Sequence, residues 1–160
     1  MTYSIRPATP DDVETILAMI KHLADYEKLA EFVQTTPEQL RKYGFGENRY
    51  FETLLCEMNN GEIIGMALYF FTFSTFVGKP SLYLEDLVVL EDHRQQGAGK
   101  ALFKALAQVA LQHDCGRIDW SVLDWNTSAI RFYNALGAHH VDGWNLNRLE
   151  RDAIEKVAAG

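Results

Sequence analysis

A glycine turn that follows directly after an apolar stretch lies in the middle of the sequence. The apolar stretch, Leu82–Leu90, is typical of a β-strand, and Arg94–Gly99 follows with the pattern R-x-x-G-x-G. A helix with an apolar face begins near Gly97. The first N–H groups of a helix lack internal partners, and the helix dipole favours an anion there. We therefore expect this strand–turn–helix segment to bind phosphate groups.

Two other phosphate-binding loops share part of this pattern. A P-loop reads G-x-x-x-x-G-K-[ST], but Arg94 stands at its first Gly and Ala101 at its Ser or Thr. A dinucleotide fingerprint needs a third Gly at the position of Leu102. Both patterns therefore fail. An ordinary strand-to-helix turn without a ligand remains the alternative, because a short glycine pattern alone is a weak indicator.

Length and composition narrow the class of protein. A chain of 160 residues with 48% hydrophobic and 23% charged residues fits a single domain over residues 1–160. The net charge of −7 disfavours a nucleic-acid partner and suits a cationic small molecule. Because no apolar run approaches the ~18–20 residues of a membrane span and the N-terminus lacks a signal-peptide core, no membrane partner is expected. Cys56 and Cys115 have neither metal-site nor disulfide spacing, which predicts no metal site and free thiols in a cytoplasmic protein.

The order of elements predicts a mixed α/β fold with a mostly antiparallel sheet. Thr9-Pro10 and Thr36-Pro37 are helix start signals, and Gln39 stands at a capping-box position. Asn59-Asn60-Gly61 predicts a hairpin turn, and Gly137 predicts the end of a late helix. We expect strands over about 3–6, 51–58, 62–73, 82–90, 117–122 and 144–149, and helices over about 9–24, 36–44, 97–112, 127–136 and 150–159.

A second segment completes a pattern found in one superfamily. The loop Leu123–Asn126 leads into a helix with Ala129, Tyr133 and Gly137. This segment resembles the N-x-x-A-x-x-x-Y-x-x-x-G motif of the GNAT superfamily of N-acetyltransferases, whose acyl-CoA loop the R-x-x-G-x-G turn also resembles.

Most of the chain, from about residue 5 to residue 149, resembles one branch of that superfamily, the diamine acetyltransferases. This branch includes the spermidine/spermine and the thialysine N-acetyltransferases. The segments Glu27-Lys28-Leu29 and Val122–Asn126 look nearer to the thialysine members. The motifs that carry the resemblance are Ile5–Ala8, Asp25–Leu29, Tyr43–Asn48, Tyr83–Asp86, Val122–Asn126 and Gly143-Trp144.

The resemblance implies a GNAT fold with acetyl-CoA bound where the central strands splay. It implies acetyl-CoA as acyl donor, no metal, and a small cationic primary amine as acceptor: a polyamine or diamine, or thialysine or a lysine-like amino acid. The amine would attack directly in a ternary complex, and the protein would be a homodimer. Two alternatives remain open: a GNAT enzyme acting on another amine (an amino acid, an aminoglycoside or a protein N-terminus), and a non-catalytic acyl-CoA-binding regulatory domain.

The resemblance also assigns two catalytic residues. An alkyl ammonium has a pKa of ~10.4, so at neutral pH only about one molecule in a thousand is the nucleophilic free amine. Glu85 is expected to accept its proton through water or to anchor the amine, and strand alternation would point it away from Leu84 and Asp86. Tyr133 is expected to protonate the leaving thiolate. The alternatives are an exposed strand carboxylate at Glu85 and a core aromatic at Tyr133.

The binding residues follow from the same motifs. The backbone of Leu87–Val89 would bond the pantetheine amides like an added strand, and a backbone N–H near Leu87 or Val88 would meet the oxyanion. The turn would wrap the pyrophosphate, and Asn126 would bond the pantetheine arm. The expected cofactor-binding residues are Leu87, Val88, Val89, Arg94, Gln95, Gln96, Gly97, Ala98, Gly99, Lys100, Asn126, Ser128 and Tyr133; the expected acceptor-binding residues are Tyr26, Glu27, Glu85, Asp119, Trp120, Ser121 and Asp142.

Two positions depart from the family pattern. Gln95 stands where these enzymes usually have Gly, which stiffens the turn but leaves its N–H groups available. Phe76 stands where they often have Trp, and this exchange would reshape a substrate wall.

Overall fold

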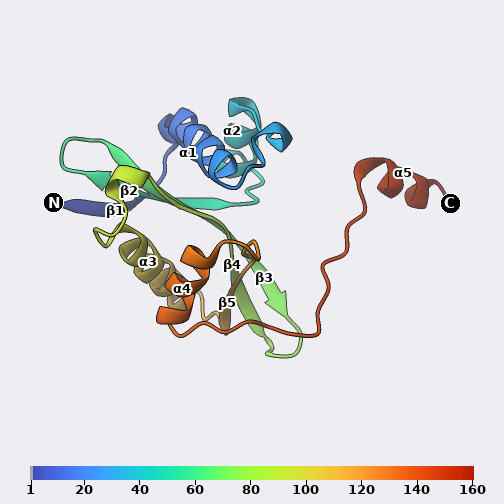
Figure 1. The fold of residues 1–160 in the computed structure, drawn as a ribbon. Coiled ribbons are helices and arrows are strands. Elements are labelled where there is room, and N and C mark those ends of the chain that lie inside the picture. Colours follow the sequence, from blue (N-terminus) through green and yellow to red (C-terminus); the bar gives the residue numbers. More distant parts are fainter. Residues whose placement is uncertain (1) are drawn as a thin grey trace. The chain divides into compact units, whose positions relative to one another are not determined.

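The chain folds into two compact units, one ending at Ser121 and the other beginning at Val122. They are seen in a computed structural model, which describes residues 2–160 (Figure 1). The first unit contains a five-stranded sheet with helices on both faces, and the second contains two helices and their connections. Within residues 2–160, no helix combines the length and the apolar character that crossing a bilayer requires.

The sheet has the strand order β1-β2-β3-β4-β5. Its strands are β1 (Tyr3–Pro7), β2 (Glu52–Met58), β3 (Ile63–Ser74), β4 (Lys79–Val89) and β5 (Arg117–Trp120). The first three pairings are antiparallel and only β4–β5 is parallel, so the expected mixed, mostly antiparallel sheet is confirmed.

Glycine-containing turns join the antiparallel strands. Gly61, at the β2–β3 hairpin, has a φ of +86°, and Gly78, before β4, has a φ of +71°. Only glycine adopts this left-handed region readily. The Asn60 side chain also accepts a hydrogen bond from the Glu62 N–H at 3.0 Å, so the turn that the sequence predicts here is stabilised as expected.

Helices cover both faces of the sheet (Figure 1). On one face lie α1 (Val13–Tyr26), which follows the 3-10 turn η1 (Pro10–Asp12), and α2 (Pro37–Phe45), which begins with the expected capping box at Thr36 and Gln39. On the other face lies α3 (Ala98–Gln112). Short 3-10 turns η2 (Ala30–Phe32) and η3 (Glu91–His93) complete the unit.

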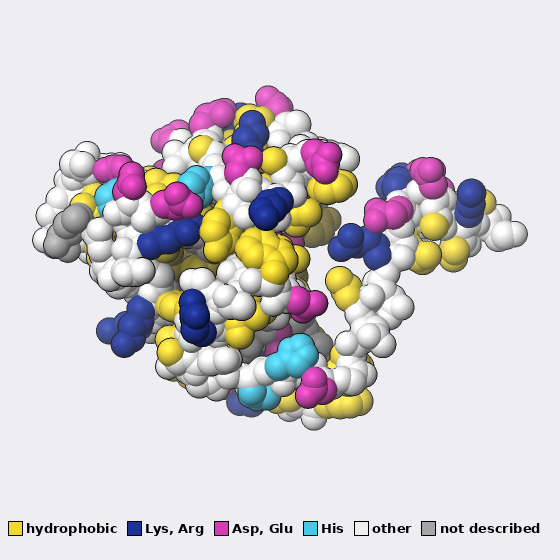
Figure 2. Space-filling view, viewed as in Figure 1, with side chains coloured by type: hydrophobic (Ala, Val, Ile, Leu, Met, Phe, Trp, Pro, Cys, Tyr) yellow, Lys and Arg dark blue, Asp and Glu magenta, His cyan; other side chains and the backbone are white. Residues whose placement is uncertain are grey.

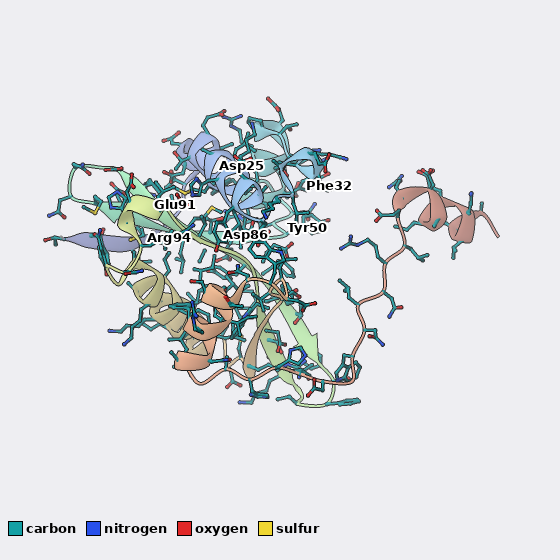
Figure 3. The ribbon with its side chains drawn as sticks, in the orientation of Figure 1. Asp25, Phe32, Tyr50, Asp86, Glu91 and Arg94 are labelled. Atoms are coloured by element: carbon teal, nitrogen blue, oxygen red, sulfur yellow. The ribbon has the colours of Figure 1, made fainter. Side chains whose placement is uncertain are left out.

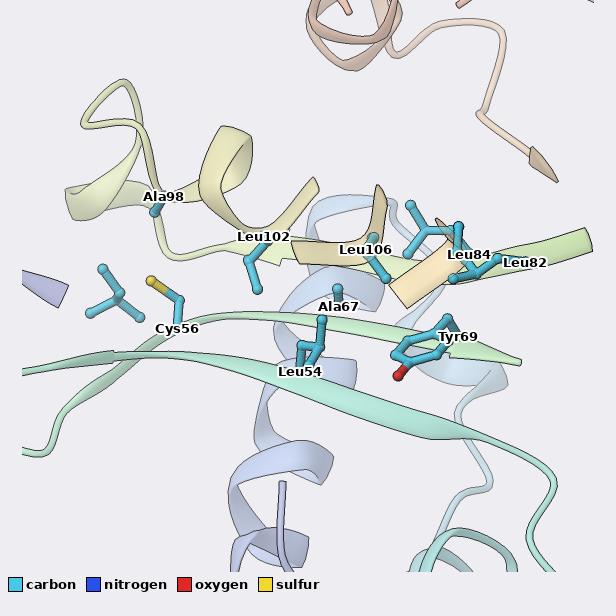
Figure 4. Close-up of a cluster of buried hydrophobic side chains, with 11 residues drawn as sticks. Leu54, Cys56, Ala67, Tyr69, Leu82, Leu84, Ala98, Leu102 and Leu106 are labelled. Atoms are coloured by element: carbon cyan, nitrogen blue, oxygen red, sulfur yellow. The ribbon is translucent and has the colours of Figure 1, made fainter. Parts of the chain in front are cut away.

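Each face of the sheet has its own buried core. Beneath α3 the core includes Leu54, Leu84 and Leu102, and Figure 4 shows this cluster between the helix and the strands. Beneath α1 and α2 the core includes Ile16 and Leu40, together with apolar side chains of β2, β3 and β4. Burial of apolar area on both faces makes the sheet a rigid platform for the side chains at its edges.

Glu85 is an extra residue in β4. In the pairing with β3, Leu68 is opposite Asp86 and Tyr69 is opposite Leu84, so Glu85 has no partner residue. Such a β-bulge shifts the alternation of side chains by one position.

The two halves of β4 confirm this shift. Before the bulge, the even-numbered Leu82 and Leu84 belong to the core beneath α3. After the bulge, the odd-numbered Leu87 and Val89 pack against that core, and Val88 belongs to the opposite one. The expectation that Glu85 and Asp86 point in opposite directions is therefore wrong, because the extra residue brings both side chains to the face covered by α1 and α2.

β4 also loses one neighbour at the bulge. β5 pairs only with residues Ser81–Leu84. From Asp86 to Val89, β4 is paired with β3 on one side and has no strand on the other within residues 2–121. The strands therefore splay at this point, and the free edge of β4 leads directly into the glycine turn.

The second unit contains α4 (Thr127–Ala135) and α5 (Arg151–Ala159). Asn126 caps α4, because its side-chain oxygen accepts a hydrogen bond from the Ala129 N–H at 3.2 Å. At the other end Gly137 has a φ of +91°, and the Ala138 N–H donates to the Tyr133 carbonyl at 3.2 Å. The predicted boundaries of this helix are confirmed to within a residue.

The strand expected around residues 144–149 is wrong. The segment has no strand structure, and within residues 122–160 no backbone ladder bonds run from it. Trp144 and Leu146 are 77% and 86% exposed. An alternating apolar pattern supplies one face for a strand, but a strand also needs a neighbour for its N–H and C=O groups. Figure 2 shows hydrophobic side chains on the surface of α5, which follows this segment.

Candidate functional site

A cavity of about 630 Å³ lies on the face of the sheet that α1 and α2 cover. Its walls are mostly aliphatic and aromatic, and its two acidic residues, Glu85 and Asp86, both come from the bulge in β4. Figure 3 shows Asp86 on β4 and Tyr50 near the α1–α2 layer. The lining residues are Ile20, Thr35, Gln39, Leu40, Tyr43, Tyr50, Phe51, Leu68, Glu85 and Asp86.

Asp86 is a carboxylate without a counterion. Glu85 is exposed and Asp86 is partly buried. Within residues 2–121, neither forms an ion pair or accepts a side-chain hydrogen bond. Burial, with smaller repulsive contributions from Glu85 and then Glu27, raises the pKa of Asp86 to about 7. The site therefore holds negative charge that no cation of the first unit neutralises.

Glu27 is a third carboxylate, which acts electrostatically on Asp86 but is not among the residues that line the cavity. It caps the C-terminal end of α1, and burial raises its pKa above the ordinary value. The three carboxylates are not grouped as metal ligands, and no cluster of three or more potential ligands occurs in residues 2–160.

Arg94 connects this region to the glycine turn. Its guanidinium lies 4.7 Å from the centre of the Tyr26 ring, and its Nε donates to the Val89 carbonyl at 3.1 Å. It also lies 3.7 Å from Glu91. Arg94 and Tyr26, predicted to bind different substrates, are thus packed against each other, and Figure 3 shows Arg94 just beyond the end of β4.

The glycine turn has the backbone geometry of an anion site. Gln95 and Gly97 both have positive φ values, +62° and +89°, and Gly97 is the N-cap of α3. The first bond that closes onto the helix runs from the Ala101 N–H to the Gly97 carbonyl at 2.9 Å. The preceding N–H groups, from Ala98 to Lys100, have no intrahelical partner, and the first turn contains no acidic residue.

The backbone edge of Leu87–Val89 is open on one side within the first unit. Unpaired N–H and C=O groups at a strand edge can bind an extended amide-containing chain. The Val89 carbonyl is partly occupied, because it accepts the Arg94 hydrogen bond. The predicted edge and the predicted turn are therefore adjacent on one continuous stretch of backbone.

The predicted residues of the second unit lie on or near α4. Asn126 is buried and its side-chain oxygen caps the helix, a role that the sequence pattern N-T-S-A could have indicated. Ser128 is exposed in the first turn. Tyr133 is partly buried, with its ring 5.3 Å from that of Phe132. Asp142 is exposed and lies 3.4 Å from His140.

Several predicted acceptor residues do not line the cavity. Asp119 forms an ion pair with Arg117 at 2.8 Å, and the Trp120 ring packs on Phe103 at 5.4 Å. The Ser121 hydroxyl lies 3.1 Å from that of Tyr83. These side chains have structural partners on β5 and its neighbours. Phe76 is 91% exposed in the β3–β4 connection and does not belong to this cavity wall.

The sequence analysis missed several residues that line the cavity. Tyr43 and Tyr50 form an edge-to-face pair with ring centres 5.6 Å apart, and Thr35 and Gln39 supply polar atoms. Asp86 was overlooked because strand alternation assigns it to the opposite face. A visible signal was the polar pair Glu85-Asp86 within an otherwise apolar strand, since consecutive polar residues break the period of two.

Neither cysteine belongs to the cavity. Cys56 is fully buried in the sheet, and burial raises the pKa of its thiol to about 11. Burial also raises the pKa of Cys115 above its ordinary value. Because the thiolate is the reactive form, both groups are poor nucleophiles at neutral pH.

Comparisons with known proteins indicate the family and the fold of this chain. The model described as "Acetyltransferase (GNAT) family" matches residues 17–138. A thialysine N-epsilon-acetyltransferase of Sus scrofa is 40% identical over 96% of both chains. A spermidine/spermine N(1)-acetyltransferase-like protein of Homo sapiens is 33% identical over 98% of this chain and 24% of its own length. An integron cassette protein of V. cholerae has a TM-score of 0.81 at 24% identity over 100% of this chain and 99% of its own, and this likeness shows the fold.

Proposed function

Because the chain belongs to the acetyltransferase (GNAT) family, we propose that it transfers the acetyl group of acetyl-CoA to the primary amine of a small cationic acceptor. The observation that carries the proposal is the cavity whose two acidic residues, Glu85 and Asp86, stand where β4 runs on to the glycine turn. Donor and acceptor features thus meet along one strand. The family model covers parts of both compact units, which supports their action as one domain.

The donor would bind along β4 and the turn. The open edge of Leu87–Val89 would pair with the pantetheine amides, and the N–H groups at the start of α3 would bind the pyrophosphate. Lys100, in the first turn of α3, would add positive charge. Asn126 keeps its side-chain NH₂ for the pantetheine arm, because its oxygen already caps α4.

The acceptor would bind with its ammonium toward the carboxylates. Glu85 and Asp86 supply the negative charge, Glu27 reinforces it, and the Tyr43 and Tyr50 rings enclose the apolar body of the amine. The chemistry would be direct: the free amine attacks the acetyl carbon, the C–S bond breaks, and Tyr133 gives its proton to the thiolate. The resulting tyrosinate then takes a proton from the new amide nitrogen.

Within the acceptor class we place thialysine and lysine-like amino acids before polyamines. The Sus scrofa relative carries thialysine in its name. Lys42 is exposed on α2 and does not line the cavity, but its ammonium lies 5.0 Å from the centre of the ring of Tyr43, which does. A cation beside this ring would attract the carboxylate of an amino acid and repel the second ammonium of a diamine. Lys42→Met should therefore raise the KM for thialysine and leave that for putrescine unchanged or lower.

We also propose that the protein is a homodimer. Its second unit exposes Trp144, Leu146 and Leu149 along an extended segment, and Ile154 and Val157 on α5. An exposed apolar series of this kind is typical of a surface that a partner covers. Sedimentation analysis of the full chain, with Trp144→Asp and Leu146→Asp as variants, tests the assembly.

Thiol release tests the activity directly. Wild-type protein with acetyl-CoA should release CoA with thialysine and lysine, more slowly with spermidine and putrescine, and least with glycine. Tyr133→Phe should lower the maximal rate by about 100-fold or more while the affinity for acetyl-CoA is retained. Silence with every amine, together with tight CoA binding, would instead indicate a binding domain.

A further inference from the structure

The bulge at Glu85 places two carboxylates in the cavity, and they are not equivalent. Glu85 is the unpaired, exposed residue of the bulge, whereas Asp86 is paired with Leu68 in the ladder and partly buried. The side chain of a ladder residue has a fixed direction, and a sheltered carboxylate is less solvated. Asp86 is thus the better positioned of the two, and Glu85 the more accessible.

Asp86 also lacks what a buried carboxylate normally has. The partly buried Asp12, by comparison, accepts hydrogen bonds from the Arg6 guanidinium and from the Thr9 N–H. Asp86 has no such donor in residues 2–121, and the charges recorded around it are those of Glu85 and Glu27. A carboxylate in this setting needs a proton or a cationic ligand.

We propose that Asp86 is the residue that accepts the proton of the acceptor ammonium, while Glu85 attracts and holds the amine at the mouth of the cavity. This inference rests on the proposed acetyl transfer. In the step, an N–H bond of the ammonium breaks and its proton moves to a carboxylate oxygen of Asp86, which leaves the amine lone pair free. The amine then attacks the acetyl carbon, and Asp86 releases its proton to solvent after the product leaves.

The acid–base properties of Asp86 fit this task. A general base is most effective when its pKa lies near the working pH. Burial and the neighbouring carboxylates raise the pKa of Asp86 to about 7. The titratable groups around it are Glu85 on β4, Glu27 at the end of α1, and the cavity tyrosines Tyr43 and Tyr50. Because Glu85 and Glu27 are acidic, each of them makes Asp86 a stronger base.

The pH dependence of kcat/KM for thialysine distinguishes the two carboxylates. The wild type should lose activity as pH falls through about 7, the value for Asp86. Glu85→Gln should move this loss of activity to lower pH, because it removes the like charge beside Asp86. It should also raise the KM for thialysine, because it removes the carboxylate that is proposed to hold the amine. Glu27→Gln should shift the profile in the same direction by less. Asp86→Asn should lower kcat by about 100-fold or more and abolish the limb.

Two further measurements keep the result interpretable. Acetyl-CoA binding by calorimetry should be equal in the wild type and Asp86→Asn, which shows that the variant is folded. In protein labelled with ¹³C at the aspartate carboxyls, the resonance that is lost in Asp86→Asn belongs to Asp86. In the wild type this resonance should titrate near neutral pH, and in Glu85→Gln its titration midpoint should lie at lower pH. A resonance that titrates only at acidic pH would overturn the inference.

The kinetic outcomes separate this inference from the function on which it rests. Asp86 is not the base if Asp86→Asn keeps the wild-type kcat and still loses kcat/KM as pH falls through about 7. The same conclusion follows if Glu85→Gln is the variant that loses both kcat and this pH dependence. In either case the enzyme still transfers acetyl groups. If the wild type acetylates no amine in the panel, the proposed function itself fails, and the catalytic role of Asp86 fails with it.

Discussion

Asp12 and Asp86 are two partly buried aspartates of the same unit with opposite surroundings. Asp12 receives two hydrogen bonds from Arg6, at 2.8 and 2.9 Å, and one from the Thr9 N–H at 2.7 Å. These contacts lower its pKa to about 2. The two charged groups that act on Asp86, Glu85 and Glu27, are both acidic, and burial is the main cause that raises its pKa to about 7.

The two aspartates differ in whether their charge is neutralised. Around Asp12, the Arg6 guanidinium also pairs with Glu57, so β1, β2 and the start of α1 are joined by satisfied charges. Around Asp86, β4 contains a bulge, a free edge and unneutralised carboxylates, which cost stability in the absence of a ligand. Proteins tolerate such costs where a substrate removes them, and this contrast supports the proposal that the cavity binds the acceptor amine.

The largest expected effect on stability is at Asp86. Asp86→Asn should raise the free energy of unfolding by about 2–4 kcal/mol at pH 8. The folded state keeps the Asp86 proton up to pH about 7, whereas the unfolded chain loses it near pH ~3.9, so wild-type stability falls as pH rises between these values. Because asparagine does not ionise, the difference in the free energy of unfolding between Asp86→Asn and the wild type should vanish toward pH 4.

Urea unfolding of both proteins between pH 4 and 8 measures this difference. The exposed Asp11→Asn serves as the matched control, because it removes a carboxylate outside the cavity. The control should unfold like the wild type. Curves of Asp86→Asn and wild type that stay parallel over the whole pH range would contradict the assignment of an uncompensated charge.

Arg6→Met should have the opposite sign. Removing this guanidinium leaves Asp12 and Glu57 without their shared partner, and we expect a loss of about 2–3 kcal/mol at pH 7. Since the folded-state pKa of Asp12 lies below its unfolded value, the lost stability is present above pH ~3.9 and disappears as pH falls through about 2.

The exposed pair Arg41–Glu14, at 3.7 Å, provides the comparison for this variant. Arg41→Met should cost no more than about 1 kcal/mol, because solvent screens an exposed ion pair. Equal losses for Arg6→Met and Arg41→Met in thermal or urea unfolding would show that the framework does not depend on the Arg6 cluster.

The smallest effect concerns the glycine turn. Gln95 adopts a φ of +62°, which costs a residue with a side chain about 1–2 kcal/mol. Gln95→Gly should therefore stabilise the protein by about 0.5–1 kcal/mol after the larger unfolded-state entropy of glycine is subtracted. Gly97→Ala should destabilise it, because φ is +89° and the added Cβ would meet the Tyr3 hydroxyl at 3.0 Å. Changes of the same sign in both variants would refute this reading.

Much of the framework could be predicted from the sequence because its signals are local. The capping box at Thr36, the hairpin at Asn60-Gly61 and the helix end at Gly137 each depend on a few neighbouring residues, and the structure has all three. The glycine turn is of the same kind. The glycine turn and the segment that ends at Gly137 also led to the correct family.

The site was harder to predict because its features depend on distant parts of the chain. The bulge at Glu85 exists only in the pairing of β4 with β3, and it brings Asp86 to the cavity against the alternation expected from the sequence alone. Tyr43, on α2, and Tyr50, in the connection that follows α2, line the same cavity, and the Tyr50 N–H donates to the Tyr43 carbonyl at 2.7 Å. The expected strand at 144–149 is wrong for a related reason, since a strand is defined by its neighbour.

Proton release on acceptor binding tests most directly whether the amine meets the carboxylates of the bulge. Thialysine is titrated at pH 6 into the complex of the protein with CoA, which has no acetyl group to transfer, in two buffers of different ionisation enthalpy. At this pH Asp86, with a pKa of about 7, is mostly protonated, and an ammonium at the cavity should displace close to one proton in the wild type and none in Asp86→Asn. Binding without proton release in the wild type, or equal release in both proteins, would contradict the account.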